Sequence, residues 1–190
     1  MKGRMRRKPG HVVPKWDGMP FRILALDPGE TTGCASAEWK PSSSEDTLTS
    51  VEQIKFCQWH IDDHPHHVQL WSALGANPYD EIVWETFDFR QRIHKDVETG
   101  EVYVDQTNLN LKAREYIGVT ELYCALNDVF HFSINSSAAK HFITDEKIKQ
   151  LGLWLPGMTH AMDATRHLLR HLVVRKKIQT PFVDIWLADD

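Results

Sequence analysis

The feature that most constrains the fold is the stretch from Arg22 to Gly33. It begins with the apolar run Ile23-Leu24-Ala25-Leu26, as expected for a strand that is buried on both faces. Asp27 ends the run, and Pro28-Gly29 followed by Thr31, Thr32 and Gly33 predicts a sharp polar turn. The Asp27 carboxylate is therefore expected at a strand end, where it can meet solvent, a metal ion or a ligand. Asp-Pro-Gly is also common turn chemistry, so Asp27 could instead only cap the turn.

The remaining pattern predicts a single α/β domain. Strands at 22–27, 34–39 and 51–61, joined by short turns, suggest an antiparallel meander. A helix near 68–74, a short buried strand at 81–85, a long helix at 108–130 and a strand at 131–135 follow. Two short helices with Ser136 or Ser137 and Thr144 as N-caps precede a last helix at 160–175. This order implies a mixed central sheet covered by helices.

The segments around these elements complete the predicted organisation. The domain is expected at 21–175, between an irregular arm at 1–20 and a tail at 176–190, and the polar segment 86–106 is expected to form a surface loop or small hairpin. An amphipathic stripe is expected along the long helix at Ile117, Glu121, Leu122, Ala125, Leu126 and Val129.

Composition narrows the function classes only partly. The chain has 190 residues and a net charge of −4, so it is long enough for one core and its total charge does not indicate a polyanion partner. The basic side chains of the first fifteen residues could meet nucleic acid or form a solvated tail: Lys2, Arg4, Arg6, Arg7, Lys8 and Lys15. Three widely spaced cysteines fit a reduced, cytoplasmic setting. No apolar stretch is long enough for a membrane span or resembles a signal peptide.

Four polar residues form the candidate catalytic constellation. Asp27 and Glu85 each end an apolar strand, and His160 and Asp163 lie at i and i+3 at the start of the last helix. If the two strands are neighbours in one sheet, their carboxylates converge at one edge. Clustered carboxylates repel one another and are costly unless a cation neutralises them, and their hard oxygen ligands suit Mg²⁺ or Mn²⁺. Two such ions roughly 3.5–4 Å apart can activate water and stabilise the leaving oxygen of a phosphodiester.

Two other features invite a ligand interpretation. The segment from His60 to His67 holds four histidines and two aspartates, but crowding and Pro65 favour an exposed turn over a metal site. The tryptophans lie beside apolar neighbours and are expected in the core: Trp39, Trp59, Trp71, Trp84 and Trp154.

At the constellation, the sequence resembles the RuvC-like Holliday-junction resolvases of the ribonuclease H-like superfamily, above all their bacteriophage members. The matching pieces are Leu24–Gly29 with Thr32-Gly33, Ile82–Glu85 and His160–Ala164, and the segment Arg114–Val119 resembles the family's long dimerisation helix. The resemblance implies a five-stranded mixed sheet with helices on both faces. It also implies a homodimer that cuts four-way DNA with two symmetric, Mg²⁺-dependent nicks, in the cytoplasm of the host if the protein is encoded by a phage.

Under this resemblance, Asp27 bridges two Mg²⁺ ions, Glu85 and Asp163 complete their shells, and His160 ligates one ion or orients the attacking water. Manganese is expected to substitute for magnesium. The candidate phosphate contacts, any one of which could instead be solvated surface charge, are Arg90, Arg92, Lys112, Arg114, Lys140 and Arg166. The basic arm and the enlarged segment 86–106 depart from the family pattern and leave the DNA structure open.

Three alternatives remain at this stage. The protein could act more broadly on forks, flaps or RNA–DNA hybrids, or it could bind junctions without cutting them. The turn after Asp27 also resembles the first phosphate loop of actin-like ATPases, but those proteins need two such domains and a longer chain than this one.

Overall fold

The computed structural model describes residues 20–40, 54–62, 65–86, 92–95, 99–105 and 111–176. The predicted arm at 1–20 and tail at 176–190 lie almost wholly outside these ranges, as does Arg90. Within the described residues, no helix is both long enough and apolar enough to cross a membrane.

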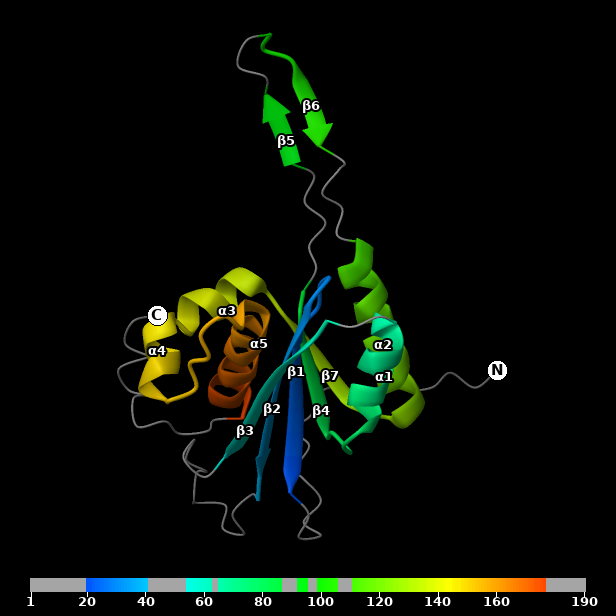
Figure 1. Cartoon of the computed structure of the whole chain (residues 1–190), viewed down its shortest axis with the longest axis vertical. Helices are drawn as coiled ribbons and strands as arrows, with labels where there is room; N and C mark the ends of the chain where they lie inside the picture. The colour runs from blue at the N-terminus through cyan, green and yellow to red at the C-terminus, as the bar shows by residue number, and fades with distance from the viewer. Residues whose placement is uncertain are drawn as a thin grey trace.

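A five-stranded mixed sheet forms the centre of the molecule (Figure 1). Its strands are β1 (Phe21–Asp27), β2 (Thr32–Trp39), β3 (Lys55–Ile61), β4 (Glu81–Glu85) and β7 (Phe130–Ile134), in the order β3-β2-β1-β4-β7. The first three strands form the predicted antiparallel meander, whereas β4 runs parallel to both β1 and β7. Thr32 and Gly33, predicted in the turn, are instead the first residues of β2, because Gly33 already pairs with Asp27.

Helices cover both faces of the sheet. Helices α1 (His66–Gly75) and α2 (Leu111–Asn127) lie on one face, and α3 (Ser136–Phe142), α4 (Asp145–Gln150) and α5 (Thr159–Arg170) lie on the other (Figure 1). Helix α5 continues into a π-helical turn at His171–Arg175. The run from Ile23 to Leu26 in β1 is apolar because Leu24 and Leu26 pack toward α1 and α2 while Ile23 and Ala25 pack toward α5.

Two local predictions need correction. Helix α3 is capped by Asn135, whose side chain accepts from the amides of Ser137 and Ala138, and not by either serine. Thr144 caps α4 as predicted. On α2, Leu122 and Leu126 are 54% and 69% exposed, because the face turned to the sheet carries Tyr116, Tyr123 and Cys124 instead.

The segment after Glu85 contains a two-stranded hairpin, β5 (Arg92–Lys95) and β6 (Val102–Asp105). Figure 1 shows this hairpin standing apart from the central sheet. The hairpin alternative predicted for 86–106 is therefore confirmed for the described residues.

Candidate active site

Asp27 and Glu85 meet at one edge of the sheet. Strands β1 and β4 are parallel neighbours in which Leu26 pairs with Trp84, so the next residue of each strand is a carboxylate at the same edge. The two side chains lie close enough that each shifts the pKa of the other. The predicted convergence of the two strand-end acids is thus confirmed.

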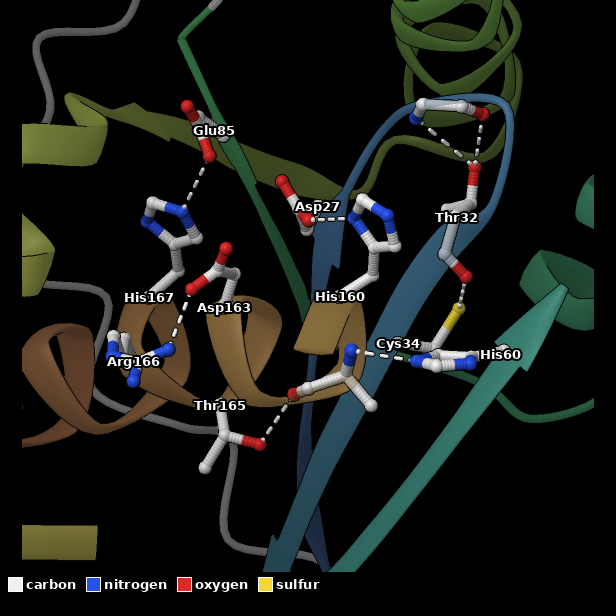
Figure 2. A network of polar contacts seen from close by, with 12 residues as sticks. Asp27, Thr32, Cys34, His60, Glu85, His160, Asp163, Thr165, Arg166 and His167 are labelled. Atoms are coloured by element: carbon white, nitrogen blue, oxygen red, sulfur yellow. Dashed lines mark hydrogen bonds and ion pairs between the residues drawn. The ribbon is translucent and has the colours of Figure 1, made fainter. Parts of the chain in front are cut away.

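Helix α5 brings His160 to this edge. The Nδ1 atom of His160 lies 2.8 Å from Oδ2 of Asp27 (Figure 2). The helix can approach so closely because Gly33 lies below it: a Cβ on Gly33 would be 1.9 Å from the carbonyl oxygen of His160. Gly33, which the sequence indicated only as a turn residue, is therefore what gives α5 access to the acids.

Asp163 lies beside the pair but is engaged by two cations. Its Oδ1 accepts from Arg166 at 2.5 Å, and its Oδ2 pairs with Lys140 at 2.9 Å. Arg166 also bonds Asp145 and has only 11% of its side chain exposed. Both cations are candidate phosphate contacts, and the structure pairs them with Asp163, while Arg166 is too buried to form part of a basic surface.

The structure places one further residue, His167, at the candidate site; the sequence pattern did not single it out. Its Nε2 lies 3.3 Å from Oε2 of Glu85, and its side chain is 1% exposed. Ligand atoms of Asp27, Glu85 and His167 all lie within 4.8 Å of one another. The spacing offered a signal, since residues 160, 163 and 167 follow the i, i+3, i+7 pattern of one helix face.

The acid pair shares its charge unequally. Burial, followed by the proximity of Glu85, raises the pKa of Asp27 from 3.8 to about 8. Burial also acts to raise the pKa of Glu85, but hydrogen bonds with His167, Asp27 and Ser136 outweigh it and lower that pKa to about 2. Without a cation, the two carboxylates therefore hold one proton between them near neutral pH.

This donor set fits a divalent cation. Two carboxylates suit Mg²⁺ or Mn²⁺, and a neutral imidazole is compatible with Mn²⁺ and softer metals. The raised pKa of Asp27 indicates a carboxylate that lacks compensating positive charge, which a cation would supply. Asp27 and Glu85 are the residues best placed to hold it, with His167 behind Glu85 and His160 on the exposed side of Asp27.

The other candidate phosphate contacts are spread over two elements. Lys112 and Arg114 lie in the first turns of α2, where Arg114 is exposed and Lys112 pairs with Glu30 at 2.9 Å. Arg92 begins β5. Their role in DNA binding stays a prediction.

The histidine segment at 60–67 has a structural role near the site. His66, predicted in an exposed turn, is 1% exposed; its Nε2 lies 3.0 Å from Oγ1 of Thr32, and its ring stacks on Tyr116. The Thr32 hydroxyl in turn donates to the carbonyl oxygen of Gly29. His66 therefore connects helices α1 and α2 to the turn that follows Asp27.

Comparison with solved structures identifies the fold. The RuvC of Thermus thermophilus in complex with Holliday junction substrate matches with a TM-score of 0.55 and 14% identity, over 82% of this chain and 96% of that chain. A second Thermus thermophilus RuvC structure matches with a TM-score of 0.54 and 15% identity, over 83% of this chain and 97% of that chain. The fowlpox virus Holliday junction resolvase has a TM-score of 0.49 and 13% identity, over 81% of this chain and 99% of that chain. No protein-family model and no curated protein matches the sequence.

The chain therefore has the mixed five-stranded α/β fold of the ribonuclease H-like class. Within that class, it has the fold of RuvC. The resemblance found in the sequence is thus confirmed as a likeness of fold.

Proposed function

We propose that this protein is a divalent-metal-dependent endonuclease that resolves four-way DNA junctions. The observation that carries the proposal is the meeting of Asp27 and Glu85 at the edge of a RuvC-like sheet, with His160 and Asp163 delivered beside them by one helix. A fold alone does not specify an activity, so the proposal depends on this constellation. A bound cation would also account for the presence of a buried pair of acids, since such a pair is costly without one.

Each residue has a distinct role in this proposal. Asp27 and Glu85 would hold two Mg²⁺ ions, with Mn²⁺ as a substitute, and Asp163 would complete the set. Bound metal would supply an activated water and stabilise charge on the leaving oxygen. His160, 47% exposed and 2.8 Å from Asp27, is placed to orient a water or hold a metal on the side from which DNA approaches.

The cations around Asp163 suit a site that works on a polyanion. Lys140 has half of its side chain exposed, so it can compensate Asp163 in the free protein and contact a phosphate in the complex. Although burial opposes it, the pKa of Lys140 is raised because Asp163, Glu85 and Asp27 lie nearby. Lys140 therefore remains charged throughout the neutral range.

A homodimer would provide the two active sites that paired nicks require. Helices α1 and α2 pack side by side (Figure 1), and Trp71 of α1 contacts Tyr123 of α2. Large apolar side chains are exposed on these two helices and just after α2; they are Val68, Trp71, Leu122, Leu126 and Phe130. Exposed apolar side chains on two helices that pack together favour a protein–protein interface, and we propose that a second copy of this chain covers them.

The experiment is cleavage of matched four-way, fork, flap and linear DNA with Mg²⁺, with Mn²⁺ and with a chelator. We expect paired symmetric nicks on the four-way junction and none with chelator. Asp27→Asn should abolish cutting and retain junction binding. Equal cutting of forks and flaps would make the protein a broader branched-DNA nuclease, and junction binding with no cleavage in either metal would make it a binding protein.

A further inference from the structure

Helix α5 begins without a cap of its own. The first amides of a helix have no acceptor within the helix and need one from elsewhere. Met158, at the N-cap position, makes no side-chain capping bond. The amide of Ala161 instead donates to Nε2 of His60 on strand β3, at 2.9 Å (Figure 2).

His60 belongs to one rung of the sheet that also contains the catalytic acid. Asp27 pairs with Gly33, and Gly33 pairs with His60, across β1, β2 and β3. Paired residues of neighbouring strands point to the same face. The first turn of α5 lies over this rung: His160 reaches Asp27, the His160 carbonyl lies over Gly33, and the Ala161 amide reaches His60.

A second contact fixes the helix one turn further on. Gln58, two residues before His60 and so on the same face of β3, donates to Oγ1 of Thr165 at 2.7 Å and to the carbonyl of Leu153 at 3.1 Å. The Thr165 hydroxyl donates to the carbonyl of Ala161 at 2.7 Å. Strand β3 therefore holds α5 at two points, and His60 is the point next to the active site.

We propose that His60 is a positioning residue, which caps α5 and thereby sets where His160 meets Asp27. It touches neither the acid pair nor, in the proposed function, the reacting phosphate. The contact requires that Nε2 of His60 carry a lone pair, because Ala161 offers only an N–H. The consequence for cleavage rests on the proposed function, whereas the capping contact itself does not.

The contact can be tested directly in the metal-free wild-type protein by nuclear magnetic resonance. We expect a scalar coupling between Nε2 of His60 and the amide nitrogen of Ala161, and slow exchange of that amide with solvent. Absence of the coupling together with fast exchange would overturn the proposal. Because no DNA is present, this result is independent of whether the protein is a nuclease.

Variants test the positioning role. His60→Leu removes the acceptor and His60→Gln offers another, while His141→Leu removes an exposed histidine elsewhere on the same side of the sheet. In His60→Leu, we expect the Ala161 amide to exchange about 5-fold faster or more, and single-turnover cleavage at saturating junction to fall about 10-fold or more with junction affinity unchanged. His60→Gln should recover most of both, and His141→Leu should match wild type.

Three outcomes contradict this role. If the Ala161 amide exchanges at the wild-type rate in His60→Leu, His60 does not cap α5. Equal loss of cleavage in the leucine and glutamine variants would assign the imidazole a chemical role instead. Weaker junction binding at an unchanged cleavage rate would make His60 a DNA contact. If wild-type protein shows the coupling but cuts no junction, the proposed function fails and the capping contact stands.

Discussion

The shared proton of Asp27 and Glu85 predicts how replacing Asp27 changes the stability of the protein. In metal-free protein, Asp27→Asn should increase the free energy of unfolding at neutral pH, although it abolishes the proposed activity. Asp27 is 8% exposed, and burial together with Glu85 raises its pKa to about 8. An acid with a raised pKa in the folded state favours folding while it is protonated, and this contribution is lost as the pH rises from its unfolded value through its folded value.

The magnitude follows from proton linkage. Between pH 5 and pH 7, the folded pair keeps one proton that the unfolded chain has released, so wild-type stability falls by roughly 1.4 kcal/mol per pH unit. Over that interval the loss is on the order of 3 kcal/mol, about 5–10 °C in Tm for a chain of this size. Glu85 has a lowered pKa of about 2, so its contribution is present above its ordinary pKa of 4.5 and is lost only as the pH falls toward 2.

The assay is urea unfolding in chelator at pH 5, 6, 7 and 8 for wild type and Asp27→Asn. Titrating groups outside the acid pair are shared by both proteins, so the difference between their unfolding free energies reports the Asp27–Glu85 pair. We expect the stability difference in favour of Asp27→Asn to grow with pH, and Asp62→Asn, at an exposed position, serves as the control for a surface Asp-to-Asn change. Mg²⁺ or Mn²⁺ should stabilise wild type and not Asp27→Asn. Parallel curves for wild type and Asp27→Asn from pH 5 to 8 would refute the assigned pKa and its cause.

Three further changes test the rest of the site. Gly33→Ala places a Cβ 1.9 Å from the His160 carbonyl oxygen, so we expect loss of cleavage and about 1–3 kcal/mol of destabilisation in urea unfolding. A fully active variant would show that the site does not need the close approach of α5 to Gly33. His167→Ala should weaken metal binding about 10- to 100-fold, measured by calorimetry, because Glu85 loses the imidazole that orients it. An unchanged metal affinity would show that His167 only packs in the core. Leu122→Asp with Leu126→Asp should give a monomer in sedimentation and single, unpaired nicks, since both apolar side chains are exposed on α2. A stable dimer would place the interface elsewhere.

The sequence was sufficient to predict the sheet and its acids for a definite physical reason. Apolar runs that end on a carboxylate indicate strands buried on both faces, and Asp27 and Glu85 each end such a run. Parallel neighbours end at the same edge, so the convergence of the two acids follows once β1 and β4 are neighbours, a condition that the sequence left open and the structure meets. No knowledge of side-chain packing was needed.

The residues that were missed depend on packing between elements. His167 is polar and lies on α5 among buried apolar residues such as Leu168 and Leu172, yet it is itself buried against Glu85. Arg166 reads as a surface cation, but it lies between two carboxylates contributed by α4 and α5. The contacts of His167 with Glu85 and of Arg166 with Asp145 join α5 to other elements, so they depend on how those elements pack, which periodicity within α5 does not encode.

The stretch from Arg22 to Gly33 specifies more than the position of one acid. Because Asp27 and Gly33 are cross-strand partners, the carboxylate and the space for α5 are set by the same pairing. A slip of β2 by one residue would turn Gly33 to the α1–α2 face and put Thr32 or Cys34 beneath the helix. Either side chain would occupy the position where a Cβ already meets the His160 carbonyl. The turn between the strands, closed by Thr32 on Gly29 and contacted by His66, therefore fixes the register on which the whole site depends.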